Sequence, residues 1–151
     1  MVRRTREAAQ ATRSRILDAA EVVFQRDGVS KTSLADIADE AGVTRGAIYW
    51  HFRNKVDVFE ATIRRVFDPI EAKLALLLAA EDDDPLQTVR TLVLHFLAQV
   101  SGDARVCRVI QTAWHKCEYV GETARVRNLH LECGNRYLAI FEGAMREAQQ
   151  R

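Results

Sequence analysis

The sequence is poor in cysteine, and no part of it stays apolar for long. Its three cysteines, Cys107, Cys117 and Cys133, are odd in number and widely spaced. This fits neither a disulfide framework nor a paired-cysteine zinc site, so free thiols in a reducing compartment are expected. No apolar run approaches the roughly 20 residues of a membrane-spanning helix. The charged first residues also lack the apolar segment of a secretion signal. We therefore expect a cytoplasmic protein.

Spacings typical of catalytic and cofactor sites are also missing. The sequence contains neither a phosphate-binding loop nor a dinucleotide-binding fingerprint. Its histidines, cysteines and carboxylates show no triad spacing, and the pair His115 and Cys117 is too weak a pattern for a metal site. We therefore expect a protein that is not an enzyme and that uses no metal and no cofactor.

Charge is unevenly distributed along a chain whose formal net charge is only +1. Residues 1–55 contain 10 Lys and Arg against 7 Asp and Glu, whereas residues 56–151 contain 12 against 14. The excess lies mainly at the start, in Arg3, Arg4, Arg6, Arg13 and Arg15. A basic N-terminal end suits contact with an anionic surface, and it is equally compatible with a solvated arm that binds nothing.

Apolar residues recur at helical spacing and alternating stretches are absent, so an all-α fold is predicted. The predicted helices cover about 12–26, 34–41, 45–51, 55–78, 85–100, 103–118 and 122 to the C-terminus. Between the fourth and fifth lies an acidic loop at 81–84. Pro69 should kink or split the fourth helix, because proline removes one backbone hydrogen bond.

The second and third predicted helices form a helix-turn-helix. Ser33 can cap the second helix, with Asp36 bonding back three residues later. Gly42 supplies the positive φ of a tight turn, and Thr44 caps the third helix. Two short helices joined by such a glycine-containing turn are typical of DNA-binding domains.

The run from Thr32 to Lys55 resembles the DNA-binding signature of TetR-family repressors. The specific matches are Ile37-Ala38, Ala41-Gly42-Val43-Thr44, Gly46, Tyr49, His51-Phe52 and Asn54-Lys55, in that register. One departure is Val58, where the family usually has leucine. The opening residues and the segment 42–52 are most similar to the family's multidrug-efflux repressors. Residues 1–55 are thus assigned to a helix-turn-helix domain with a basic N-terminal arm.

That register predicts the DNA contacts. Arg45 lies at the start of the recognition helix, where a guanidinium can bond guanine O6 and N7. Gly46 permits close backbone approach, and Ala47 can touch a thymine methyl. Phosphate contacts are expected from Ser33, Thr44, Tyr49, His51 and Lys55, with Trp50 nearby. Capping alone is the alternative role of Ser33 and Thr44, and core packing that of Tyr49, Trp50 and His51.

For residues 56–151 the resemblance implies a helical domain that binds a small ligand and dimerises. Expected ligand-binding residues are Val66, Leu92, Phe96, Ile110, Gln111, Trp114, His115, Tyr137 and Phe141, with Asn135 as a further polar candidate. Each of the apolar ones is equally compatible with ordinary core packing. The resemblance also implies two more helices after the seventh, so this domain is expected to be incomplete.

Together these features predict a ligand-responsive transcriptional repressor. It would bind a palindromic operator of a multidrug-efflux operon as a homodimer, and a small apolar or aromatic effector would release it. Two alternatives remain open. The chain could heterodimerise with, or titrate, a full-length regulator, or it could be a thiol-based sensor.

Overall fold

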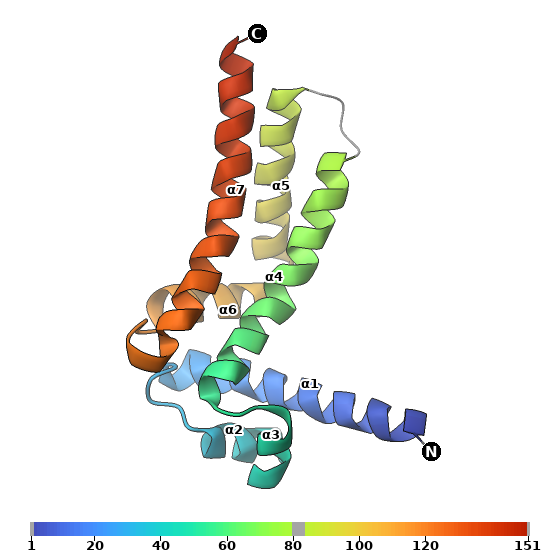
Figure 1. Ribbon diagram of the computed structural model, residues 1–151, viewed down its shortest axis with the longest axis vertical. Coiled ribbons are helices and arrows are strands. Elements are labelled where there is room, and N and C mark those ends of the chain that lie inside the picture. Colours follow the sequence, from blue (N-terminus) through green and yellow to red (C-terminus); the bar gives the residue numbers. More distant parts are fainter. Residues whose placement is uncertain (1, 80–83, 151) are drawn as a thin grey trace.

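The computed structural model describes residues 2–79 and 84–150, and within that part the chain is helical without any strand (Figure 1). The elements are α1 (Val2–Asp27), α2 (Leu34–Ala41), α3 (Arg45–His51), α4 (Lys55–Ala79), α5 (Pro85–Gly102), α6 (Ala104–His115), the short 3-10 helix η1 (Gly121–Thr123) and α7 (Ala124–Gln150). The all-α prediction is confirmed. Residues 81–83 of the predicted acidic loop lie outside the described residues, as do the side chains of Arg3, Arg4 and Cys133.

The helices form a small head and an upper layer (Figure 1). The head consists of α1, α2 and α3, and α4 leads from it into the layer. There α5 packs against both α4 and α7. Helix α6 crosses between the two parts and packs on α1. Consequently α4 and α6 are the helices that reach from the upper layer to the head.

Side-chain caps define the short helices of the head. Ser33 Oγ accepts from the Asp36 N–H at 3.2 Å, and Asp36 Oδ2 accepts from the Ser33 N–H at 2.8 Å. Thr44 Oγ1 accepts from the Ala47 N–H at 3.2 Å. These bonds satisfy N–H groups that a helix start leaves without an intrahelical partner. The capping roles predicted from sequence are confirmed.

One apolar core joins the head to α4 and α6. Phe24 and Phe59 meet edge to face, with ring centroids 5.3 Å apart, and both are almost fully buried. Ile37 and Ile48 contribute one inward side chain from each short helix. Because α3 has only seven residues, it depends on this packing for its stability. Packing in the head therefore holds the outer face of α3 in a fixed orientation.

The predicted start of the first helix was wrong, and so was a split of the fourth helix at Pro69. Helix α1 begins at Val2 rather than near residue 12, so the basic N-terminus is helical and not an arm. Its first residues include Ala8, Ala9 and Ala11, and alanine has the highest helix propensity. Pro69 does not split α4, which runs unbroken to Ala79. A proline φ of about −65° suits a helix, and tertiary packing along α4 outweighs one missing hydrogen bond.

Several large apolar side chains of the upper layer are exposed. They are Val93, Leu94, Phe96 and Leu97 on α5 and Leu131, Leu138, Phe141 and Met145 on α7. Despite this apolar surface, none of the described helices combines the length and hydropathy required to cross a membrane.

Candidate nucleic-acid interface and apolar cavity

The outer face of α3 carries the residues expected to meet DNA. Arg45 and Gly46 open the helix on the exposed side, whereas Ile48 is fully buried beneath them. Tyr49 is 62% exposed and Trp50 is 74% exposed. The core-packing alternative for these two aromatic residues is therefore wrong, because their rings face solvent. Both are available for an external partner.

The turn before α3 is held by an arginine that the sequence placed only in the basic N-terminal end. Gly42 adopts φ 60° and ψ 41°, and its N–H donates back to the end of α2. Arg15 on α1 donates from Nη2 to the carbonyls of Ala41, at 2.8 Å, and Gly42, at 3.1 Å. A cation at these carbonyls also complements the negative end of the α2 dipole. Arg15 thereby fixes the angle between α2 and α3.

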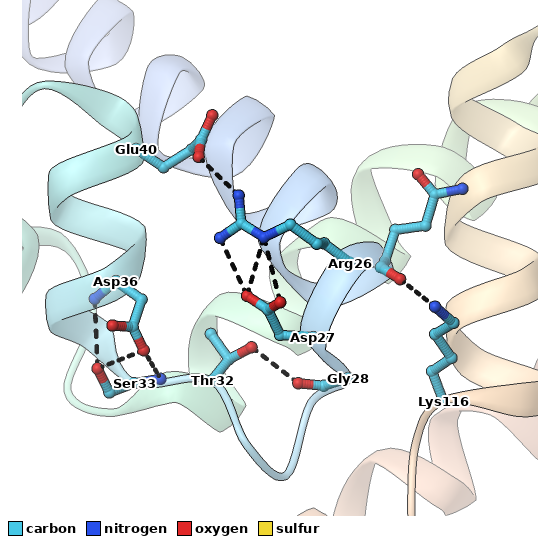
Figure 2. A network of polar contacts seen from close by, with 9 residues as sticks. Arg26, Asp27, Gly28, Thr32, Ser33, Asp36, Glu40 and Lys116 are labelled. Carbon is cyan, nitrogen blue, oxygen red and sulfur yellow. Dashed lines mark hydrogen bonds and ion pairs between the residues drawn. The ribbon is translucent and has the colours of Figure 1, made fainter.

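The connection between α1 and α2 is tied to its surroundings (Figure 2). Thr32 donates its hydroxyl to the Gly28 carbonyl at 2.7 Å, and Lys116, just after α6, donates its ammonium to the Gln25 carbonyl. The Val29 N–H donates to the Lys116 carbonyl at 3.1 Å. The end of α6 is therefore hydrogen-bonded directly to the head.

Lys55 takes part in the same connection. Its ammonium donates to the Ser30 carbonyl at 2.7 Å and to the Thr32 carbonyl at 3.0 Å. An ammonium group has three donors, so one N–H is left to the phosphate contact that remains a prediction for this residue. Replacing Lys55 would therefore disturb the head as well as the DNA contact.

His51 ends α3 between two aromatic rings. Its ring lies edge-on to Trp50, with centroids 4.7 Å apart, and Arg13 of α1 sits 5.2 Å above the adjacent Phe52 ring. Burial lowers the pKa of His51, and the positive charge of Arg13 lowers it further. His51 is consequently suited to offer a neutral N–H, rather than a charge, to a phosphate oxygen.

Two glycines of this motif should respond in opposite ways to alanine. At Gly42, a positive φ makes alanine unfavourable, and Gly42→Ala should lower the free energy of unfolding by about 1–2 kcal/mol. At Gly46, an added Cβ meets only Thr44 Oγ1, at 3.9 Å. Gly46→Ala should therefore raise the free energy of unfolding by about 0.5–1 kcal/mol. Urea denaturation measures both. Gly46→Ala should nevertheless weaken operator binding, and undiminished binding would contradict a close approach of DNA at this position.

The upper layer contains an apolar cavity of about 410 Å³. It is lined by Phe67 and Ile70 of α4, Leu92, Val93, Phe96, Leu97, Gln99 and Val100 of α5, Val106, Ile110 and Trp114 of α6, and Gly134, Tyr137, Leu138 and Phe141 of α7. Six of the nine expected ligand-binding residues are among them: Leu92, Phe96, Ile110, Trp114, Tyr137 and Phe141. Four helices thus build one pocket.

The other expected ligand-binding residues do not line this cavity. Val66 is buried on the side of α4 that packs into the common core. Gln111 and His115 are exposed, and so is Asn135 on α7. On α6 the cavity faces Val106, Ile110 and Trp114, which follow each other every four residues. Gln111 and His115 each lie one residue, about 100° around the helix, further on.

The lining chemistry restricts what the cavity can hold. None of the lining residues is charged, and Gln99, Tyr137 and Trp114 supply the polar groups. A charged ligand would lose its hydration without gaining an ion pair, which is unfavourable. Elsewhere in the described part of the chain, no cluster of His, Cys, Asp and Glu is arranged to hold a metal ion. The cavity therefore suits an uncharged, apolar molecule.

The thiol of Cys117 is poorly suited to redox sensing. Burial, together with a smaller effect of the Glu118 carboxylate, raises the pKa of Cys117 to about 11. Cys107 donates its thiol to the Val100 carbonyl at 3.6 Å. A reactive cysteine needs a lowered pKa, since the thiolate is the nucleophile. For Cys117 this weighs against the thiol-sensor alternative.

Two family models match the chain. The model described as "Bacterial regulatory proteins, tetR family" matches residues 16–62, which span the head and the start of α4. A second model, "MAATS-type transcriptional repressor, C-terminal region", matches residues 84–150. Together they cover both parts of the molecule.

Known proteins resemble the chain over nearly its whole length. The HTH-type transcriptional regulator TtgR of Pseudomonas putida is 40% identical over 99% of this chain and 73% of its own length. NalD, a secondary repressor of the MexAB-OprM multidrug efflux pump in Pseudomonas aeruginosa, superposes with a TM-score of 0.74 at 34% identity, over 95% of this chain and 70% of its own. SmeT, repressor of a Stenotrophomonas maltophilia multidrug efflux pump, solved in complex with triclosan, gives 0.75 at 32% identity, over 93% and 66%.

Proposed function

Because the chain belongs to the TetR family of bacterial transcriptional regulators, we propose that it represses a multidrug-efflux operon and is released by an apolar effector. Arg45 would read bases of a palindromic operator, and an uncharged aromatic molecule would occupy the cavity. The operator would be bound by a homodimer whose recognition helices lie about 34–36 Å apart. The proposal rests on one observation: the exposed recognition helix α3 and the apolar cavity are connected through α4 and α6.

The DNA part of the proposal rests on the face of α3. Arg45 stands at the N-terminal end of the helix, from which side chains reach base edges in helix-turn-helix proteins. Ser33, Thr44, Tyr49, His51 and Lys55 surround it and would hold phosphate groups, with Trp50 beside them. Because the side chains of Gly46 and Ala47 are small, the backbone of α3 would come close to the DNA at this point, with Ala47 near a thymine methyl.

The effector part rests on the cavity and on one relative. The lining is apolar, with Gln99 as a hydrogen-bonding group, and small-molecule sites have this character. SmeT, which shares this fold, was solved with triclosan, a chlorinated aromatic molecule. We propose that the present cavity accepts molecules of the same class.

Release would follow from helices shared by the two sites. Val106, Ile110 and Trp114 line the cavity on α6, and Lys116 at its end bonds the head. A shift of α6 or α4 on effector binding would reorient α3. Because half-site spacing is fixed by DNA geometry, a small reorientation in each protomer lowers operator affinity.

The test is a fluorescence-anisotropy titration against DNA from upstream of the protein's own gene, with unrelated DNA as competitor. Competitor-resistant binding by two protomers, reversed by triclosan, is the expected result. Binding by one protomer without sequence preference would instead support the role of a module that needs a full-length partner. Specific binding that triclosan leaves unchanged would contradict an effector of this class.

The fluorescence emission of Trp114 should report whether the cavity is occupied. Its ring is 63% exposed in the open cavity, so an apolar ligand should remove it from water. In a Trp50→Phe variant, Trp114 is the sole remaining tryptophan, and its emission should shift to shorter wavelength as triclosan binds. If calorimetry detects binding while the emission stays unchanged, Trp114 does not line the site that is used.

A further inference from the structure

A buried carboxylate joins the head to both helices that run between the two sites. Glu21 lies on α1, and its side chain is only 1% exposed. Arg65 of α4 approaches Oε1, with Nη2 at 3.4 Å. Arg105 of α6 approaches Oε2, with Nε at 3.2 Å. The two oxygens of one carboxylate are therefore paired with arginines from two different helices.

The surroundings of Glu21 make this pairing hard to replace. Burial raises the pKa of the carboxyl group, whereas the nearby Arg65, Arg105 and Arg108 guanidinium groups lower it. Little water can reach the carboxylate, so it has no ready substitute for a lost arginine. The neighbouring Asp18 also pairs with Arg65 and, at 3.0 Å, with Arg105, but it is half exposed. Water can compensate for a lost arginine at Asp18, whereas the buried Glu21, whose Oε1 has an ion pair with Arg65 but no hydrogen bond, lacks that compensation.

Both arginines sit beside cavity-lining residues. Arg105 directly precedes Val106, and Arg65 comes two residues before Phe67. Helix α6 has only twelve residues, so Arg105 moves with the helix when a ligand displaces Val106 or Ile110. Helix α1 lies below α6 and crosses the lower part of α4 (Figure 1), and it contacts both helices.

We propose that Glu21 is a positioning residue that transmits the separation of α4 and α6 to the DNA-binding head. This inference rests on the effector response proposed above. With the cavity empty, the carboxylate holds Arg65 and Arg105 together and fixes α1 beneath them. A ligand that moves α4 and α6 apart moves Arg65 and Arg105 away from opposite oxygens of the Glu21 carboxylate. Helix α1 must then either follow one of the two helices or lose both ion pairs.

The test compares Glu21→Gln with wild type in hydrogen–deuterium exchange. The probe is N-phenyl-1-naphthylamine, an uncharged dye that fluoresces in apolar surroundings, so its affinity is measured on the same samples. In wild type, saturating dye should change amide exchange in residues 14–27 by about tenfold, a typical allosteric coupling. In Glu21→Gln the dye should bind with unchanged affinity, and the change in exchange should fall to about twofold or less.

Two further variants keep the test independent of folding. Arg105→Gln alters a more exposed partner, 42% exposed, and should uncouple in the same way. Arg136→Gln removes a pair with Glu71, at 3.0 Å, that links α7 to α4 without touching the head, and it should keep the full response. Because each variant is compared with and without dye, a general loss of stability cancels.

The outcomes separate this inference from the proposed function. A full response in both Glu21→Gln and Arg105→Gln, or loss of the response in Arg136→Gln as well, would overturn the role of Glu21. Dye binding to wild type without any change in residues 14–27 would overturn it too, while leaving operator binding intact. Failure of the dye to bind wild type would overturn the proposed effector site and this inference together.

Discussion

Replacement of Arg45 by alanine should weaken binding to the operator by about 1–3 kcal/mol, roughly 5- to 150-fold. Arg45 is the first residue of α3 and is exposed, with the fully buried Ile48 anchoring the helix behind it. Its removal should take away the proposed bidentate contact to one base without disturbing the core. The loss should therefore be confined to operators that carry guanine at the contacted position.

Competition titrations with operators changed at single base pairs test this. Arg45→Ala should lose discrimination at one position and keep it at the others. Arg90→Ala removes the same charge from an exposed site on α5 and serves as the control. If Arg45→Ala weakens binding to every sequence equally, Arg45 contacts phosphate and the base-reading role fails.

Filling the cavity should weaken the effector response while operator binding persists. Gly134 of α7 lines the cavity, and a Cβ built there meets nothing within 4 Å. Gly134→Leu therefore places a side chain in the ligand's space without a clash at its origin. Since overfilling a site costs about 1–3 kcal/mol, triclosan affinity should fall by about tenfold or more. Release from the operator should then need correspondingly more triclosan.

Gly143→Leu is a matched control on the same helix. It is equally open at its Cβ, but it is not among the lining residues. Both changes replace glycine inside α7, so both should stabilise the helix similarly. Calorimetry with triclosan should show weaker binding only for Gly134→Leu. Equal affinity in both variants would mean that the ligand binds elsewhere.

The local sequence was sufficient to predict features in which neighbouring residues satisfy each other's hydrogen-bonding groups. The capping of α2 by Ser33, the bonds of the Gly42 N–H to the end of α2 and the capping of α3 by Thr44 all involve partners within a few positions. Such signals have the same meaning in any fold, and the structure confirms them. The resemblance of residues 32–55 to TetR-family repressors rests on the same segment, and the comparisons confirm the family.

Predictions failed where a helix face had to be chosen. On α6, Ile110 and Trp114 line the cavity as expected, and Val106 lines it without having been predicted. Gln111 and His115 do not line it. Polar character suggested Gln111, whereas the orientation of α6 on α1 selects the face. The helical N-terminus of α1 and the continuous α4 through Pro69 show the same limit. Each depends on propensity or packing summed over a long helix rather than on one residue.

The helix-turn-helix and its caps followed from the amino-acid sequence alone, because their hydrogen bonds join residues within one short segment. The packing of the helices, in contrast, sets which side of α3 faces outward, which residues enclose the cavity, and the meeting of Glu21 with Arg65 and Arg105. Those arginines lie 44 and 84 positions from Glu21 in the chain. No local spacing in the sequence relates these arginines to Glu21. The packing of α1, α4 and α6 brings their guanidinium groups to the buried carboxylate.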